Sequence, residues 1–478
     1  MARKKTAREV ATIAKTPIEP AFLAKPRSHH TLAERKDLGR ALRVATPREA
    51  HAGWEAPDDR TDPIDIILAS EVGRREDLLP IRHGRMLATP FTFYRGAAAI
   101  MAADLATTAR TGYTVQACGD CHLLNFGAFA TPERRIIFDI NDFDETFPAP
   151  WEWDLKRLAG SFVVASRANG HGPAEQVNTA EALVRSYAAT MAELAEMLAL
   201  EVWYSSLDWQ AVIAETDDAT LRRRRSQVLN KAMARDHAAE FVKLAHFVDG
   251  MPRIKDEPPL LFHPDEFDVP EFQKAIVGNI AAYRESLSLE KRVLFDRYEM
   301  SDVAIKVVGV GSVGTLCTVA LFFAAEGDAL FLQVKQVMPS VLEPYVGATP
   351  FSSNGERVVF GQRLMQAASD VFLGHFVGAG GGNYYVRQLR DVKVRPMVEV
   401  YTPANMADFA QTCGGALARA HARSGDPAVI SGYMGKGRVL SRAIGEFAVQ
   451  YADQNEADHA RLIEAVRQGR IEARFEEA

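Results

Sequence analysis

The chain has 478 residues, which is too long for one simple core and suits two or three packed units. Its hydrophobic share of 47% and charged share of 25% are ordinary for a globular protein, and its net charge of -6 argues against a nucleic-acid binder. Four cysteines exclude a disulfide framework, and no apolar run reaches the ~18–20 residues of a membrane span. The basic N-terminus lacks the apolar core of a secretory signal, so we expect a cytoplasmic protein.

Residues 1–85 are expected to form a basic arm and a lead-in to the folded part. Residues 1–50 hold twelve Lys or Arg against five Asp or Glu, and four prolines interrupt them. One short helix, over residues 32–44, is the element that we predict there. A solvated tail explains this composition more simply than a partner-binding segment.

Residues 86–300 are expected to contain some of the candidate functional residues and to form a helical lobe. An alanine-rich helix is predicted over 93–107, short strands over 113–117 and 135–140, and a helix from Asp154 onward. Further along, apolar residues recur at helical spacing and indicate a stripe that faces the core. They are Leu183, Tyr187, Met191, Leu194 and Leu198.

Residues 301–400 are rich in β-branched and apolar runs that Gly, Asp or Pro interrupts. Three consecutive antiparallel strands are predicted, over 303–308, 315–324 and 329–336. A helix and two further strands are predicted after them, over 355–369, 384–389 and 397–400. Residues 401–478 return to helices, so the order of elements predicts an α+β fold.

A first group of polar residues lies between predicted strands. Asp120 and Asn125 stand five residues apart in a turn-forming stretch, and Asp142 follows the next predicted strand within a run of acids. Phosphoryl transfer needs a carboxylate that orients the acceptor hydroxyl, and Mg²⁺ held by oxygen ligands. We assign the first role to Asp120 and the second to Asn125 and Asp142. The alternative is an Asx-rich turn whose carboxylates cap backbone amides.

This pattern resembles the catalytic loop of kinase-like small-molecule phosphotransferases, such as aminoglycoside and choline kinases. Their motif is His-Gly-Asp-x-x-x-x-Asn, followed by a strand that ends in Asp-Phe-Glu or similar; here Cys118 replaces the histidine. The resemblance implies that residues 142–144 carry a metal ligand and that Asp154 braces the loop from below. Because the spacing before Asp142 is slightly longer than usual, Asp139 is the alternative ligand.

A glycine motif forms the second candidate group. Gly309, Gly311 and Gly314 lie between two predicted strands. A lone G-x-G-x-x-G is a weak signal, and the dinucleotide-binding form requires a helix after the glycines. Here a strand follows, as in the kinase loop whose backbone amides cover the phosphates of ATP.

Lys335 lies near the end of the third of these predicted strands, 329–336, and completes this group. Its strand resembles the kinase strand that ends in the phosphate-binding lysine, so we expect Lys335 to hold the phosphates of ATP. Glu343 or Glu356 is expected to pair with it. The alternative is a surface hairpin with an exposed lysine.

The order of the two groups differs from that of a standard kinase, in which the glycine loop precedes the catalytic loop. Here the catalytic loop comes first, and joining the two ends of the chain would restore the usual order. We therefore predict a circularly permuted, kinase-like two-lobed fold. Residues 301–400 would form the β-rich nucleotide lobe, 86–300 the helical lobe, and 401–478 further helices.

Over most of its length the chain also resembles a bacterial family called domain of unknown function 2252. The resemblance rests on long runs such as CGDCHLLNFG, FDINDFDETFPAPWEWDLKRL and GQRLMQAASDVFLG. It implies a kinase-like relationship and indicates no substrate.

The predicted function is an ATP- and Mg²⁺-dependent phosphotransferase that acts on an unknown hydroxyl acceptor, a small molecule or a protein. Nucleotidyl transfer and a catalytically inactive, nucleotide-binding scaffold are the alternatives that stay open. Cys118 and Cys121 form a CxxC pair, but a redox or zinc site is less favoured, because Cys317 and Cys413 are isolated.

Overall fold

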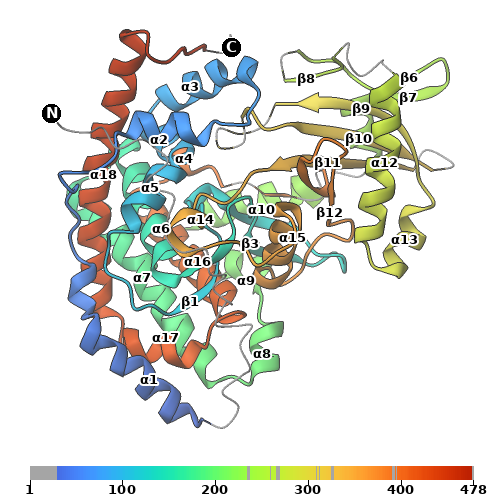
Figure 1. Ribbon diagram of the computed structural model, residues 1–478. Coiled ribbons are helices and arrows are strands. Elements are labelled where there is room, and N and C mark those ends of the chain that lie inside the picture. The colour runs from blue at the N-terminus through green and yellow to red at the C-terminus, as the bar shows by residue number, and fades with distance from the viewer. Residues whose placement is uncertain are drawn as a thin grey trace.

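The computed structural model describes most of the chain after the basic arm. The described residues are 30–233, 237–258, 260–264, 270–307, 309, 311, 313–324, 328–389, 393–394 and 396–475. The predicted arm therefore lies outside the described residues up to position 29. Helices and sheets are combined in a mixed α+β fold, as the order of predicted elements indicated (Figure 1).

The described helices run from the N-terminal α1 to the long C-terminal α18. They are α1 (Leu32–Ala45), α2 (Pro63–Ser70), α3 (Leu79–Leu87), α4 (Pro90–Gly96), α5 (Ala98–Leu105), α6 (Trp151–Ala168), α7 (Pro173–Glu196), α8 (Ala199–Tyr204), α9 (Trp209–Ala214), α10 (Ala219–Met233), α11 (His237–Leu244), α12 (Pro270–Ser286), α13 (Leu289–Phe295), α14 (Glu343–Val346), α15 (Asn354–Met365), α16 (Pro403–Ala422), α17 (Pro427–Met434) and α18 (Arg438–Arg467).

The strands fall into one six-stranded sheet, one four-stranded sheet and two pairs. They are β1 (Thr114–Ala117), β2 (Phe126–Ala130), β3 (Ile136–Ile140), β4 (Phe147–Pro150), β5 (Leu207–Asp208), β6 (Ala245–Val248), β7 (Met251–Ile254), β8 (Leu261–Phe262), β9 (Glu299–Lys306), β10 (Cys317–Phe323), β11 (Ala329–Val337), β12 (Gly374–Val377), β13 (Asn383–Gln388) and β14 (Lys393–Val394).

The six-stranded sheet has the order β12-β13-β11-β10-β9-β8. β9, β10 and β11 pair as consecutive antiparallel strands, which confirms the prediction for residues 303–336. Alternate residues of β10 enter different clusters. Ala320 and Phe322 pack with Phe295 of α13, whereas Val319 and Leu321 pack with Leu244 at the end of α11. This sheet therefore buries both faces.

The four-stranded sheet has the order β14-β2-β3-β5. Its central hairpin, β2 and β3, lies directly between the predicted catalytic loop and the acidic run, with Phe126 opposite Ile140. Every residue of β3 is buried, so its end is held firmly. This hairpin brings the two halves of the first polar group to one end of the sheet.

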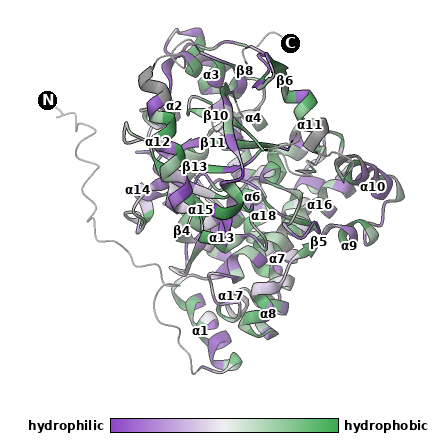
Figure 2. Cartoon of the chain, turned by 90° about the vertical axis from the view of Figure 1, so that its right-hand side faces the viewer, coloured by the Kyte–Doolittle hydropathy of each residue, from purple (hydrophilic) through white to green (hydrophobic). Residues whose placement is uncertain are grey.

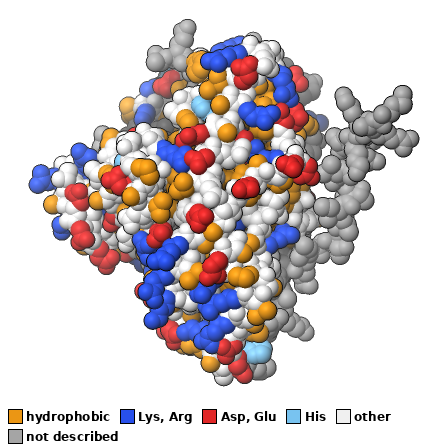
Figure 3. Space-filling view, turned by 90° about the vertical axis from the view of Figure 1, so that its left-hand side faces the viewer, with side chains coloured by type: hydrophobic (Ala, Val, Ile, Leu, Met, Phe, Trp, Pro, Cys, Tyr) orange, Lys and Arg blue, Asp and Glu red, His pale blue; other side chains and the backbone are white. Residues whose placement is uncertain are grey.

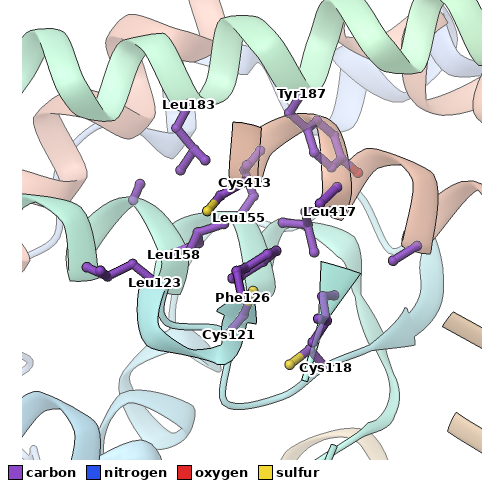
Figure 4. Packing of buried hydrophobic residues seen from close by; sticks show 14 of the residues in the cluster. Cys118, Cys121, Leu123, Phe126, Leu155, Leu158, Leu183, Tyr187, Cys413 and Leu417 are labelled. Carbon is purple, nitrogen blue, oxygen red and sulfur yellow. The ribbon is translucent and has the colours of Figure 1, made fainter. Parts of the chain in front are cut away.

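The main core joins helices from both halves of the chain. Leu183 of α7 points toward Leu155 and Leu158 of α6 and toward Cys413 of α16, and Leu417 of α16 belongs to the same cluster (Figure 4). Most helices carry hydrophobic and hydrophilic residues side by side, as expected of helices that bury one face (Figure 2). The predicted stripe along α7 thus faces the core, except that Leu198 lies beyond the helix and is exposed.

The N-terminal helix and the C-terminal helices pack against one another. The Nε of Arg43 in α1 donates to the carbonyl of Tyr433 in α17 at 2.8 Å, and the backbone N–H of Arg474 donates to the carbonyl of Pro80 in α3 at 2.7 Å. On the face shown in Figure 3, Lys and Arg side chains gather toward the end of the molecule where α1 lies. Segments from both ends of the described chain therefore belong to one packed unit.

Two predicted elements differ from the structure. The single helix expected over 93–107 is two helices, α4 and α5, which meet at Ala97. Residues 398–400 form a short 3-10 helix, although a strand was expected there. Composition could not separate these cases, because alanine favours either helical arrangement and short apolar runs are ambiguous. Within the described residues, no helix is long and apolar enough to cross a membrane.

Candidate active site

A cavity of about 590 Å³ lies where the six-stranded sheet faces the loops around β2 and β3. This volume is ordinary for a small-molecule site. Among the predicted site residues, six line the cavity: Asp120, Asn125, Asp142, Gly309, Gly311 and Lys335. Gly314 and Glu343 do not line it. The structure thus brings the two separate polar groups of the sequence to one place.

The loop that carries Asp120 is held by its backbone. Gly119 has a φ of +84°, and a Cβ there would lie 2.2 Å from the carbonyl oxygen of Glu145, so glycine alone fits. Asp154, in the first turn of α6, accepts hydrogen bonds from the backbone N–H of Cys118 at 2.6 Å and of Gly119 at 2.9 Å. These are the contacts that the resemblance led us to expect of Asp154.

The carboxylate of Asp120 has a fixed orientation. Its Oδ1 accepts hydrogen bonds from Nε of Arg157, at 2.8 Å, and from the Nη2 of the same guanidinium. Its backbone carbonyl accepts from Nδ2 of Asn125 at 2.7 Å. Nε2 of His122 lies 3.9 Å from Oδ2, but burial lowers the pKa of His122 to about 3, so this imidazole is neutral. His122 is therefore no cation at neutral pH.

Lys335 forms an ion pair with Asp144, two residues after the predicted metal ligand. Nζ lies 2.6 Å from Oδ2, and the hydroxyl of Tyr385 donates to Oδ1 of the same carboxylate at 2.9 Å. Burial opposes the ionisation of Asp144, but the adjacent Lys335 outweighs it and lowers the pKa to about 2. The pKa of Asp142 is raised by burial and by the charge of Asp144. A cation near Asp142 would offset both effects.

The partner of Lys335 is thus neither Glu343 nor Glu356, the two residues that the sequence suggested. Oε2 of Glu356 accepts from the backbone N–H and the hydroxyl of Ser352, at 2.9 and 2.5 Å, where α15 begins. Glu343 starts the short helix α14 and lies outside the cavity lining. Spacing along the chain could not reveal the observed partner, because Asp144 is 191 residues away from Lys335.

Arg357 of α15 is a fully buried contributor that sequence analysis missed. Its Nη1 donates to the carbonyl of Thr146 at 2.7 Å, and its Nη2 donates to the carbonyls of Asp144 and Met338 at 2.9 Å each. It therefore ties the acidic run to the segment after β11. Its Nε donates to Oδ1 of Asn354 within the same helix, but its link to the acidic run could not be read from the sequence, because Thr146 and Asp144 are 211 and 213 residues away.

The described residues of the cavity provide too few ligands to surround a metal ion with protein alone, but their oxygen atoms suit a partly hydrated Mg²⁺. In the described part of the chain, no group of three or more His, Cys, Asp or Glu could hold a metal ion. Mg²⁺ commonly uses one or two carboxylates and completes its shell with phosphates and water. Asn125 and Asp142 both line the cavity, whereas Oδ2 of Asp139 accepts from the backbone N–H of Ala367 at 2.9 Å. Asp142 is accordingly the better placed of the two candidate carboxylates.

The CxxC cysteines belong to the packing beneath the loop. Cys118 and Cys121 are buried free thiols, and Sγ of Cys118 donates to the carbonyl of Asp142 at 3.3 Å. The pKa of Cys118 is raised by its contact with Cys121 and by burial, and burial raises that of Cys121 to about 11. Such thiols are unreactive and poor metal ligands, which leaves the redox and zinc interpretations without support.

Further charged side chains line the cavity from other elements. Arg387 of β13 donates from Nε to Oε1 of Gln333 at 3.0 Å and from Nη1 to the carbonyl of Asn141 at 3.2 Å. Arg74, Arg82 and Arg95 come from the region of α2 to α4. Burial raises the pKa of Glu145, also in the lining, to about 7. The cavity lining therefore combines several carboxylates with several basic side chains.

The chain was compared with known protein families, curated proteins and solved structures. A family model described as "Uncharacterized protein conserved in bacteria (DUF2252)" matches residues 74–465. No curated protein and no solved structure matches the chain. The matched stretch includes Asp120, Asn125, Asp142 and Lys335.

Proposed function

The chain belongs to the DUF2252 family of bacterial proteins, and we propose that it is an ATP- and Mg²⁺-dependent phosphotransferase that acts on a hydroxyl acceptor. One observation carries the proposal. Asp120, Asn125 and Asp142 meet Lys335 in one cavity, although the lysine's ion-pair partner, Asp144, is 191 residues distant in the chain. Each residue type has a use in phosphoryl transfer, whereas a structural turn would not need a buried lysine opposite its acids.

The residues present fit a magnesium ion bound together with phosphates. When bound, Mg²⁺ would neutralise charge on the phosphate oxygens of ATP. Asn125 and Asp142 would hold it through their side-chain oxygens. The raised pKa of Asp142 fits this role, because a divalent cation stabilises the carboxylate that burial and Asp144 disfavour.

In the proposed reaction Asp120 accepts the hydrogen bond of the acceptor hydroxyl and takes its proton. The hydroxyl oxygen forms a bond to the γ-phosphorus, while the bond from that phosphorus to the β–γ bridging oxygen breaks. The electron pair of the broken bond leaves on ADP. Arg157 orients Asp120 through two hydrogen bonds to Oδ1, which leaves Oδ2 to receive the proton. Lys335 binds the phosphate oxygens.

We also propose that the fold is kinase-like, two-lobed and circularly permuted. Gly309, Gly311 and Gly314 come between two antiparallel strands, β9 and β10, and the next strand carries a buried lysine. A helix, α15, packs against β12 and β13 of the same sheet and reaches the acidic run through Arg357. Helices from both ends of the described chain pack together, which fits a chain whose ends were once joined.

Thermal unfolding with nucleotide tests the proposal. A ligand that binds only the folded state raises its stability by RT ln(1 + [L]/Kd), about 2.7 kcal/mol at 100 times Kd. We expect millimolar ATP with Mg²⁺ to raise the Tm of the wild type, and we expect the Mg²⁺-dependent part of the shift to vanish in Asp142→Ala. The matched control is Asp453→Ala, an exposed aspartate of α18, which keeps the full shift.

Equal shifts in the wild type and Asp142→Ala would contradict this assignment of the metal ligand. No shift in a folded wild type would refute nucleotide binding as a whole. Binding without measurable transfer to any acceptor, water included, would favour a nucleotide-binding scaffold over an enzyme.

A further inference from the structure

Arg95 lies in the last turn of α4 and lines the cavity beside Asp120 and His122. The roles described so far do not use it. It comes from a part of the chain that the kinase resemblance does not cover.

The backbone on both sides of Arg95 is held by buried arginines. The carbonyl of Tyr94 accepts a hydrogen bond from Nη2 of Arg157 at 3.2 Å, and the carbonyl of Gly96 accepts from Nη2 of Arg82 at 2.9 Å. Both arginines are 2% exposed. Neither bond involves the side chain of Arg95, so they fix where that side chain starts.

Arg157 connects this backbone to the proposed catalytic carboxylate. The same guanidinium bonds the carbonyl of Tyr94 and Oδ1 of Asp120, and the hydroxyl of Tyr94 donates to the carbonyl of Arg157 at 2.6 Å. The backbone next to Arg95 and the carboxylate of Asp120 are thus both held by the buried guanidinium of Arg157. Pre-organisation of this kind is characteristic of residues that stabilise a transition state.

Two described glycines of the motif, Gly309 and Gly311, lie near both groups. A Cβ at Gly309 would lie 4.0 Å from Nη2 of Arg95, and a Cβ at Gly311 would lie 3.9 Å from Oδ2 of Asp120. Phosphates bound beside these two glycines would therefore have the guanidinium of Arg95 and the carboxylate of Asp120 at the same end. That end is where the acceptor oxygen must meet the γ-phosphorus.

The other cavity arginines have different duties. Arg74 donates from Nη1 to the carbonyls of Gly311 and Val313, at 3.1 and 2.7 Å, so it holds the backbone at these two residues. Arg387 bonds Gln333 and the carbonyl of Asn141, on the side of the cavity that holds Lys335. Arg82 bonds Glu71 and the carbonyl of Gly96, and Arg157, which holds Asp120, is not part of the cavity lining. Of the four described arginines that line the cavity, Arg95 is the one whose guanidinium lies near Gly309.

We propose that Arg95 is a catalytic residue that binds the equatorial oxygens of the phosphoryl group during its transfer, as an arginine supplied from within the same chain. This inference rests on the proposed function. Charge spreads over those three oxygens in the transition state, and a planar guanidinium donates two hydrogen bonds to them. Arginines in this role accelerate phosphoryl transfer by about 10³-fold to 10⁵-fold in other enzymes. Arg95 contacts the phosphoryl group while it is being transferred. Lys335 and the metal ligands, and not Arg95, bind ADP in the ground state.

The test compares Mg·ADP binding with and without aluminium fluoride, which imitates the planar phosphoryl group. The proteins are the wild type, Arg95→Lys, Arg95→Met and the control Arg110→Met, an exposed arginine outside the cavity. We expect aluminium fluoride to tighten ADP binding at least about 10-fold in the wild type and the control, which is ~1.4 kcal/mol. In both Arg95 variants ADP alone should bind as in the wild type, and the tightening should disappear.

Three results would overturn the inference. Tightening that survives in both Arg95 variants would leave the proposed function intact and remove Arg95 from it. Loss of ADP binding in the folded Arg95→Lys protein, judged by its melting without ligand, would make Arg95 a ground-state binding or structural residue. Absence of any Mg·ADP binding to the wild type would refute the proposed function, and with it this role.

Discussion

The two sides of the cavity are held in different ways. On one side, the loop of Asp120 is fixed by partners that do not face the ligand space: Asp154 holds its backbone and Arg157 holds its carboxylate. On the other side, Lys335 of the six-stranded sheet makes its ion pair with Asp144 across the cavity itself. A ligand phosphate would compete for Lys335 but for none of the bonds that hold the Asp120 loop.

This difference suggests a division of labour. The side formed by the Asp120 loop, called the acid side here, is expected to keep the same contacts whether or not a ligand is bound. The side formed by the six-stranded sheet, called the sheet side here, is held to the acid side partly by the ion pair between Lys335 and Asp144. The phosphates of a nucleotide could replace Asp144 in that pair, so we expect the contacts of Lys335 to change on binding. Variants of the two sides should therefore fail in different ways.

The largest expected effect is that of Asp120→Asn. The amide keeps an oxygen for Arg157 but cannot take the acceptor's proton, so we expect turnover to fall by about 10³-fold. Nucleotide affinity and Tm should stay near the wild-type values, because the loop is held by Asp154. Steady-state rates and thermal shifts with Mg·ATP measure the two quantities separately. Undiminished turnover would remove Asp120 from the reaction.

Asp154→Ala should destabilise the acid side. It leaves the buried N–H groups of Cys118 and Gly119 without their acceptor, and each costs roughly 1–3 kcal/mol. We expect the free energy of unfolding to fall by about 3 kcal/mol in urea titrations, with little recovery on adding ATP. Asp154→Asn, which keeps one acceptor oxygen, should lose about half as much. A stability loss below about 0.5 kcal/mol in both variants would contradict the bracing role.

Lys335→Met should act mainly on nucleotide binding. Removal of the ammonium takes away a charge-assisted bond to phosphate, so we expect ATP affinity to fall by about 10-fold to 100-fold. The loss of stability without ligand should be only about 1–2 kcal/mol, because the Asp144 side chain is 22% exposed and keeps the hydroxyl of Tyr385. If Lys335→Met melts like Asp154→Ala and binds ATP normally, the comparison between the two sides is wrong.

Glu145 should make stability fall as pH rises. Burial raises its pKa from 4.5 to about 7, so between these values the folded state binds more protons than the unfolded state. By linkage the contribution to the free energy of unfolding decreases with increasing pH in this window, by at most about 1.4 kcal/mol per unit. In Glu145→Gln this decrease should be absent. Urea titrations at pH 5, 6 and 7 measure it, and parallel slopes in both proteins would contradict the assignment.

The parts of the site that could be predicted are those whose chemistry is local in the sequence. Asp120, Asn125 and the 142–144 run are close in the chain, and the three strands of 303–336 are apolar, β-branched runs separated by Gly and Asp. Lys335, which the resemblance to a kinase strand singles out, lines the same cavity. Its function, like those of the other site residues, stays a prediction.

The parts that could not be predicted depend on packing between distant segments. Asp144 becomes the partner of Lys335 only when the sheet docks on the acidic run, and Arg357 acts on carbonyls 211 and 213 residues away. Arg157 sits in a helix in which nearly every residue is buried, so composition offers no reason to single it out. The boundary between α4 and α5 was missed because alanine is compatible with one helix or two.

The central claim is that ATP phosphates lie beside Lys335, and covalent labelling tests it most directly. An ATP analogue with an acyl phosphate transfers its acyl group to a lysine next to the phosphates, and peptide mapping then identifies that lysine. We expect labelling of the peptide that contains Lys335, blocked by excess Mg·ATP and absent in Lys335→Met. Labelling only of other lysines, or labelling of Lys335 that ATP does not reduce, would contradict it.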